Sequence, residues 1–138
     1  MRGRSSGMTP GLSSETEITA SPPLIALMPM GLCFPGTGDA GDLPPRPECA
    51  PLWHPRIIEA LGSIRLTILI GQYAQARYLT ARPKRSMTEH VCGFRSALPG
   101  YFPLPHPSWR STMWMRRNPW LESEVLPDLR RLVADIIS

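Results

Sequence analysis

The chain has 138 residues, of which 42% are hydrophobic and 19% charged, and its formal net charge is +4. This length and apolar content suit one small domain with its own core. No apolar run reaches the roughly 18 residues of a membrane span, and the N-terminus lacks the apolar stretch of a secretory signal. Three cysteines, an odd number, argue against a disulfide framework, so the cytoplasm is the expected compartment.

The positive charge permits a polyanionic partner such as nucleic acid, although an ordinary basic protein has the same balance. Residues 1–22 are polar, rich in Gly, Ser, Thr and Pro, and show no hydrophobic periodicity. This composition predicts a flexible tail. The remainder, 23–138, is predicted to form a single domain.

The first predicted elements are a strand, a long loop and a helix. Leu24–Met30 is a short apolar run, which is typical of a buried strand in a parallel sheet. Gly31–Glu48 is rich in Gly and Pro and is long for a connection, which indicates a functional loop. Cys49–Leu61 has helical spacing, and Gly62 follows it as a C-cap. The apolar face of this helix is expected to comprise Leu52, Ile57, Ile58 and Leu61.

A second strand and two helices follow. Arg65–Ile70 is rich in β-branched residues and is predicted to be a buried strand. A glycine turn leads from it into a short helix over Gln72–Ala81. Ser86 and Glu89 fit a capping box, which predicts the start of another helix that ends near Ala97.

The third strand and the last helix complete the pattern. Tyr101–Leu104 is the strand, and the helix is expected to open with Asn118 as N-cap and Pro119 at its first position. Pro127 should bend this helix near its first turns. Its apolar face is expected to comprise Leu121, Val125, Leu126, Leu129, Leu132, Val133 and Ile136.

This alternation predicts an α/β fold, a three-layer α/β/α domain with a short central parallel sheet. Three strands are few for such a sheet. We therefore expect the sheet to be incomplete at its N-terminal side.

A histidine between two prolines follows the third strand. Pro105 and Pro107 restrict the backbone of His106, which should present its ring at the carboxyl end of the sheet. Sites form at that edge in open α/β folds. The imidazole can donate a hydrogen bond to a developing anion, and Ser108 can bind a phosphate or the backbone of the loop.

Aromatic and basic residues alternate after this histidine. They are Trp109, Arg110, Trp114, Arg116, Arg117 and Trp120. The mixture suits base stacking and phosphate contacts with nucleic acid. It equally suits tryptophans in the core and arginines on a solvated surface, and composition alone leaves both interpretations open.

Three segments together resemble the uracil-DNA glycosylase superfamily. HPS at His106–Ser108, followed by the Trp- and Arg-rich stretch and RNPW, is similar to the motif of that superfamily. Cys33 and Cys49 enclose a segment that begins FPG and includes PPRPE, and they look like the second cysteine pair of its iron–sulfur class. Pro55–Leu79 resembles the helix, strand, Gly turn and helix of that class. The resemblance extends from about residue 24 to residue 136.

The resemblance implies a DNA glycosylase of base excision repair. Such a hydrolase extrudes uracil or another damaged base from DNA and cuts its N-glycosidic bond. His106 would stabilise negative charge on the departing base, and Pro107 and Ser108 would pinch the DNA backbone. The further DNA contacts are expected from Arg110, Arg116 and Arg117. The protein is expected to act on DNA as a monomer.

The resemblance also implies a cofactor. Cys33 and Cys49 would be the second half of a [4Fe–4S] ligand set, which takes four cysteines in a full-length relative. The third cysteine of this chain, Cys92, falls in a predicted helix. The alternative is that Cys33 and Cys49 are two free thiols or a disulfide. A zinc site that adds His54 lacks an established spacing.

The superfamily also has a first motif, a Gly–Pro–Gly type loop that positions the attacking water. GMTPG at Gly7–Gly11 matches it in letters but has no strand before it, so we expect a coincidence. The asparagine that uracil-reading members use has no counterpart at the end of the first apolar run, and Ser111 stands where an asparagine is expected. The alternative function is therefore a catalytically inactive, truncated remnant or a DNA-binding module.

Overall fold

Two parallel strands form the centre of the molecule. The structure is a computed structural model that describes residues 24–80 and 83–138, so the predicted tail and the GMTPG motif lie outside the described residues. Strand β3 (Thr67–Ile70) pairs with β4 (Tyr101–Leu104), with Thr67 opposite Tyr101 and Ile70 opposite Leu104. This parallel pairing confirms the predicted α/β class.

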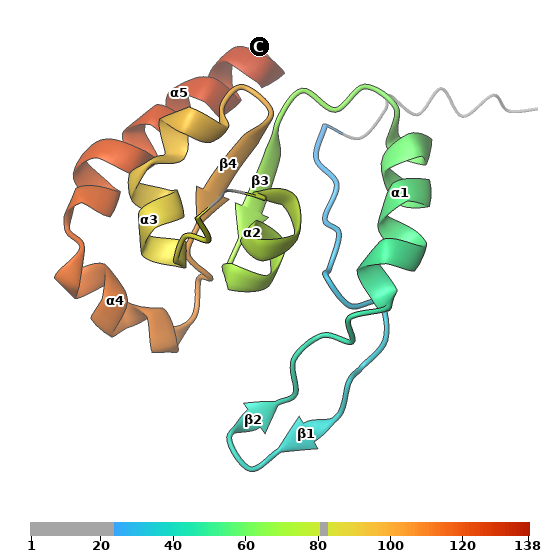
Figure 1. Ribbon diagram of the computed structural model, residues 1–138. Helices are drawn as coiled ribbons and strands as arrows, with labels where there is room; N and C mark the ends of the chain where they lie inside the picture. Colours follow the sequence, from blue (N-terminus) through green and yellow to red (C-terminus); the bar gives the residue numbers. More distant parts are fainter. Residues whose placement is uncertain (1–23, 81–82) are drawn as a thin grey trace, which may run out of the picture.

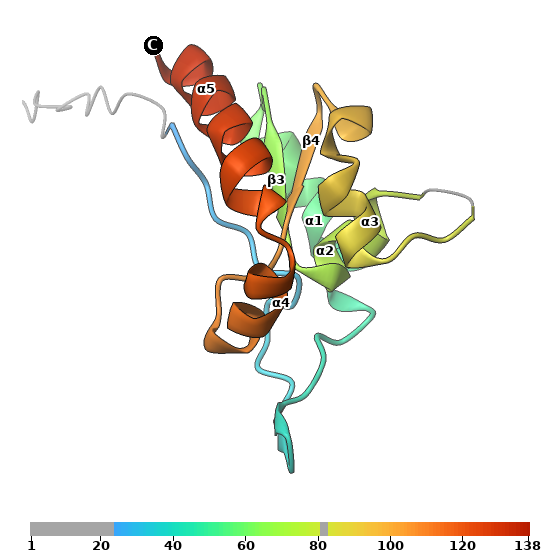
Figure 2. The same cartoon turned by 90° about the vertical axis from the view of Figure 1, so that its left-hand side faces the viewer.

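Helices lie on both sides of this strand pair (Figures 1 and 2). Helices α1 (Cys49–Leu61) and α2 (Gln72–Tyr78) are on one side and α5 (Leu126–Ile137) is on the other. The other helical elements are α3 (Met87–Cys92), η1 (Phe94–Ala97), η2 (Trp109–Ser111), α4 (Thr112–Arg117) and the π-helical turn η3 (Leu121–Val125). None of the helices in the described part of the chain is long and apolar enough to cross a membrane.

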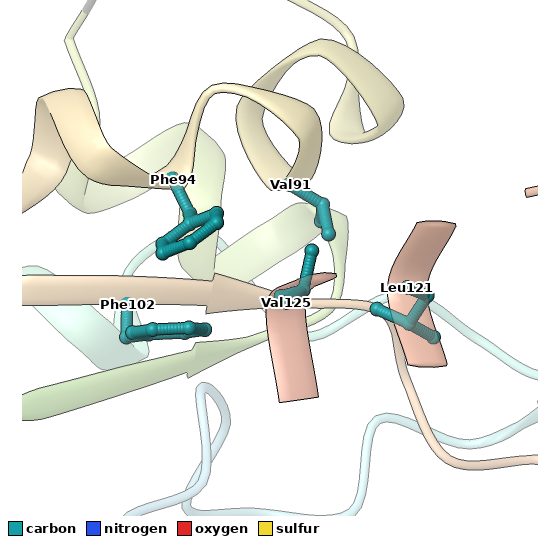
Figure 3. Close-up of a cluster of buried hydrophobic side chains, with 5 residues drawn as sticks. All are labelled: Val91, Phe94, Phe102, Leu121 and Val125. Atoms are coloured by element: carbon teal, nitrogen blue, oxygen red, sulfur yellow. The ribbon is translucent and has the colours of Figure 1, made fainter. Parts of the chain in front are cut away.

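A cluster of buried side chains joins β4 to α3, η1 and η3 (Figure 3). Its members are Val91, Phe94, Phe102, Leu121 and Val125. The ring centroids of Phe94 and Phe102 are 4.8 Å apart, and α5 covers the cluster with further leucines. All seven apolar positions predicted for the last helix are buried or half-buried, so the helical spacing identified this face correctly.

The prediction of a strand at Leu24–Met30 is wrong. The segment has no strand pairing, and Leu24 and Leu27 are 78% and 91% exposed. An apolar run becomes a buried strand only where a neighbouring strand bonds to it, and here β3 bonds to β4 alone. Within the described residues the parallel sheet therefore has two strands where three were expected.

The predicted loop over Gly31–Glu48 contains a small antiparallel hairpin. Strands β1 (Thr37–Gly38) and β2 (Gly41–Asp42) form it, and the Leu43 N–H donates to the Gly36 carbonyl at 2.9 Å. Figure 1 shows the hairpin extending away from the helices at the end of the loop. Loop residues thus have a defined shape that their composition did not predict.

Helix α1 has the predicted bounds but buries a different face. The expected apolar residues Leu52 and Leu61 are 53% and 40% exposed, whereas His54 is 1% exposed. The imidazole of His54 is bonded at both nitrogens, Nε2 to the Pro29 carbonyl at 2.8 Å and Nδ1 to the Tyr78 hydroxyl at 2.5 Å. A buried polar group needs such partners, so this histidine orients the helix.

The capping residues that the sequence predicted are confirmed at two helices. Gly62 caps α1 with a φ of 71°, and Ser86 and Glu89 form the complete capping box of α3. The helix predicted from Ser86 to Ala97 breaks at Gly93, after which η1 continues it. The helix predicted to reach Ala81 ends earlier, at the last residue of α2.

Asn118 has a different role from the predicted N-cap side chain. Its Nδ2 donates to the Trp114 carbonyl at 2.8 Å, so its side chain satisfies the end of α4 instead. Pro127 lies at the start of α5, directly after η3. The irregularity expected from this proline is a π-helical turn on its N-terminal side, where the proline cannot donate a helical hydrogen bond.

Candidate active-site loop

His106 lies where β3 and β4 end. Gly71 follows β3 with a φ of 86°, and its N–H donates to the Leu104 carbonyl at 2.9 Å. A Cβ atom at Gly71 would lie 3.6 Å from the Cβ and 3.8 Å from the Cδ2 of His106. The positive φ favours glycine, which allows the turn after β3 to lie against the histidine. The Gly71 turn and the HPS loop thus meet at the carboxyl edge of the sheet.

Two serines hold the main chain of this loop. The His106 carbonyl accepts from the Ser108 N–H at 2.9 Å and from the Ser111 hydroxyl at 2.5 Å. The Ser111 N–H donates to the Ser108 carbonyl at 2.9 Å. The side chain of His106 remains exposed. Ser111, which the sequence marked only as a departure from the expected asparagine, is therefore a positioning residue of the loop.

Gln75 supports the same edge from behind. It is 1% exposed, and its Nε2 donates to the Leu104 carbonyl at 2.8 Å and to the Leu69 carbonyl at 3.3 Å. One amide therefore bridges the ends of both parallel strands. Sequence reasoning missed this residue, and the available signal was a polar residue one helical turn after Gly71.

Arg110 connects this loop to the hairpin of the inter-cysteine loop. Its Nη2 donates to the Ala40 carbonyl at 2.9 Å, and its guanidinium carbon lies 5.4 Å from the ring centroid of Trp109. A Cβ atom at Gly41 would approach Nη2 to 2.9 Å, and Gly41 has a φ of 114°. A side chain at Gly41 would therefore displace the arginine.

The three tryptophans have two different roles. Trp109 is 80% exposed beside Arg110. Trp114 donates from Nε1 to the Thr88 hydroxyl at 2.8 Å and lies edge-on to Trp120 at 5.8 Å, and both rings pack against the core cluster. Of the two interpretations left open by composition, the core interpretation holds for Trp114 and Trp120. Only Trp109 offers a free face for stacking.

Arg116 and Arg117 form the basic end of α4. Both side chains are exposed in the last turn of this helix. Within residues 24–80 and 83–138, neither takes part in an ion pair. Their guanidinium groups are therefore available to an anionic partner.

The two cysteines of the resemblance are in contact. Cys33 Sγ lies 3.4 Å from Cys49 Sγ, with Cys33 exposed and Cys49 buried. The hydrogen bond from the neighbouring Cys49 thiol, together with a partial loss of solvent, raises the pKa of Cys33, and the charge of Arg46 acts in the opposite direction. The predicted cysteine pair is thus formed in space.

This cysteine pair does not fit a complete iron–sulfur site. A [4Fe–4S] cluster takes four cysteine ligands, and the sequence has three cysteines. In the described part of the chain, no group of three or more His, Cys, Asp or Glu residues is arranged to hold a metal. His54 cannot complete a zinc site, because its two nitrogens already bond to Pro29 and Tyr78.

An open cavity of about 1000 Å³ lies between α2 and α3 and does not include His106. Gln75, Lys84, Arg85 and His90 are among its lining residues. Burial and the nearby charge of Arg85 lower the pKa of His90. The HPS loop itself is an exposed surface, so the His106 side chain is accessible from solvent.

The fold and the loop define a class of α/β protein whose candidate site lies at the carboxyl edge of a parallel sheet. The family model of the uracil DNA glycosylase superfamily matches residues 17–130, well over half of the chain. The chain belongs to the uracil DNA glycosylase superfamily, whose members act on DNA. The matched range contains the cysteine loop, the Gly71 turn and the HPS loop, and it confirms the resemblance at the level of the superfamily.

Proposed function

We propose that this protein is a DNA repair glycosylase that hydrolyses the N-glycosidic bond of uracil or another damaged base. The observation that carries the proposal is the exposed His106, held against the Gly71 turn at the carboxyl edge of the sheet, in a chain of this superfamily. Its main-chain position is set by Ser108 and Ser111, so the ring is available for the reaction.

The chemistry assigned to the loop is stabilisation of the leaving base. A water molecule adds to the sugar carbon and loses one proton to solvent, the electron pair of the broken bond moves onto the extruded base, and the released base anion takes up a proton from solvent. The imidazole of His106 donates a hydrogen bond to the oxygen on which negative charge develops. Pro107 and Ser108 hold the DNA backbone beside it. The proposed phosphate contacts come from Arg110, Arg116 and Arg117.

The test is release of free base from labelled uracil-containing DNA, single-stranded and double-stranded, with thymine-containing DNA of the same sequence as control. We expect alkali-labile abasic sites only in the uracil-containing strands. Absence of abasic sites in both uracil substrates would contradict the catalytic assignment.

The iron–sulfur class stays a prediction. The spacing of Cys33 and Cys49 supports it, whereas the count of three cysteines does not supply a full ligand set. We propose that this chain by itself holds no cluster, and that it acts in the cytoplasm as a monomer.

A DNA-binding module without hydrolysis is the second candidate. It is favoured because residues 24–80 and 83–138 contain no Gly–Pro–Gly type loop to position water. Base release separates the two candidates, since binding is expected from both.

Replacing Arg116 and Arg117 together by Gln is expected to weaken binding to single-stranded DNA and to reduce its salt dependence. The slope of log affinity against log salt is negative. Each lost phosphate contact should make it less steep by about 0.7. Fluorescence anisotropy at four or more salt concentrations measures this slope. The matched control is Arg56→Gln on α1, whose guanidinium lies over Trp53. An equal slope for the double variant and the control would exclude α4 from the interface.

A further inference from the structure

Cys33 and Cys49 form an isolated dithiol. Their sulfur atoms are 3.4 Å apart, although the residues are 16 positions apart in the sequence. Cys33 is exposed in the loop, whereas Cys49 is the first residue of α1 and is 7% exposed. The remaining cysteine, Cys92, is exposed on α3. Two thiols in contact, one accessible and one buried, have the arrangement of a dithiol that can form a disulfide.

We propose that Cys33 and Cys49 form a reversible disulfide that controls the loop between them and its contact with Arg110. A disulfide has a sulfur–sulfur bond of about 2.05 Å, so the two atoms need to approach by only about 1.4 Å. Cys33 lies in a loop without helix or strand pairing, which allows this movement. In a reducing compartment such disulfides are transient and respond to the redox state.

The oxidant is a low-molecular-weight disulfide of the glutathione type. The thiolate of the exposed Cys33 attacks one sulfur of this disulfide and releases one thiolate, which leaves a mixed disulfide on Cys33. The thiolate of Cys49 then attacks Cys33 Sγ and releases the second thiolate. The protein loses two electrons and two protons, and the small disulfide becomes two thiols.

Cys33 is the residue that reacts first, because it is exposed whereas Cys49 is buried.

The disulfide is expected to affect the hairpin that lies between the two cysteines. The segment between the cysteines carries the β1–β2 hairpin, which is closed by the bond from Leu43 N–H to the Gly36 carbonyl. The Ala40 carbonyl in its turn accepts from Arg110. A covalent bond at the base of this loop restricts its open conformations. Oxidation should therefore hold the hairpin closed and Arg110 against it, away from a phosphate.

The experiment uses the full chain with Cys92→Ser, which removes the third thiol. The protein is equilibrated in glutathione buffers from fully reduced to fully oxidised, and the remaining thiols are alkylated and counted by mass spectrometry. We expect a species that is two hydrogen masses lighter, that carries no alkyl group and that dithiothreitol reverses. Adding Cys33→Ser to this background should abolish that species and leave Cys49 as a thiol, because its sulfur is buried.

Amide hydrogen exchange of Leu43 tests the coupling to the hairpin. We expect exchange at Leu43 to be slower in the oxidised form by about tenfold or more, as for a local opening that has become rarer. The Cys33→Ser variant should show no dependence on redox buffer. None of these measurements uses base release, so their outcome is independent of the proposed enzymatic function.

Two results would overturn the proposal. One is that only mixed disulfides with glutathione form across the whole redox range. The other is that both thiols of anaerobically purified protein are protected from alkylation by bound iron and sulfide. A disulfide that forms without slower exchange at Leu43 would overturn the coupling to the hairpin, and with it the link to Arg110.

Discussion

His106→Gln is expected to lower the rate of base release by about 100- to 1,000-fold, the range for removal of one hydrogen-bond donor to a developing anion. The folded structure should be unaffected. The His106 side chain is exposed, and the bonds that hold its loop run through its carbonyl group to Ser108 and Ser111. Glutamine retains those main-chain bonds, but its amide N–H ends at a different position from the imidazole N–H, so the hydrogen bond to the base oxygen should be lost.

Single-turnover rates on uracil-containing single-stranded DNA measure the effect, and thermal unfolding monitors stability. The matched control is His90→Gln, which changes a histidine on α3 outside the HPS loop. We expect the control to stay within about twofold of the unmodified protein, because His90 lies away from the HPS loop. If both variants released base at the same rate, His106 would have no part in the reaction.

The elements that the sequence predicted well are those with local signals. The capping box of α3 depends on Ser86 and Glu89 alone, and Gly62 ends α1 through its own φ angle. The last helix was predictable because most of its repeated apolar positions pack in or against one core cluster. Strands β3 and β4 were found with errors of at most two residues, since both are short apolar runs bounded by turns.

The elements that the sequence predicted poorly depend on partners elsewhere in the chain. Leu24–Met30 has the composition of a strand, but strand formation requires a neighbour to complete its hydrogen bonds. The buried face of α1 is decided by His54, whose two partners, Pro29 and Tyr78, lie in other elements. A count of apolar residues along a helix does not detect a buried polar anchor.

The candidate site also combines features that local sequence signals predict with features that depend on distant partners. The prolines around His106 are a local signal, and they identified the loop. The contacts that position it were not visible in advance, because Ser111 and Gln75 bond to main-chain carbonyl groups whose location depends on the fold. Arg110 was expected to face DNA, yet its contact with Ala40 comes from a hairpin that the loop composition did not reveal.

Phe102→Ala is expected to have the largest effect on stability. Phe102 is fully buried on β4, and its ring packs on Phe94 within the central cluster. Truncation of a buried phenylalanine costs about 3–5 kcal/mol, because the transfer free energy is lost and a cavity remains. A small domain is stable by about 5–15 kcal/mol, so this variant should lose a large share of its free energy of unfolding.

Guanidinium-induced unfolding, followed by far-ultraviolet circular dichroism, measures this loss. Phe34→Ala is the matched control, since it removes the same atoms from a side chain that is 73% exposed. Its free energy of unfolding should change by no more than about 0.5 kcal/mol. An equal loss in both variants would mean that the Phe94–Phe102 cluster is not the core. The loop that carries His106 would then lack its main support, because it directly follows β4, and β4 is anchored in the cluster through Phe102.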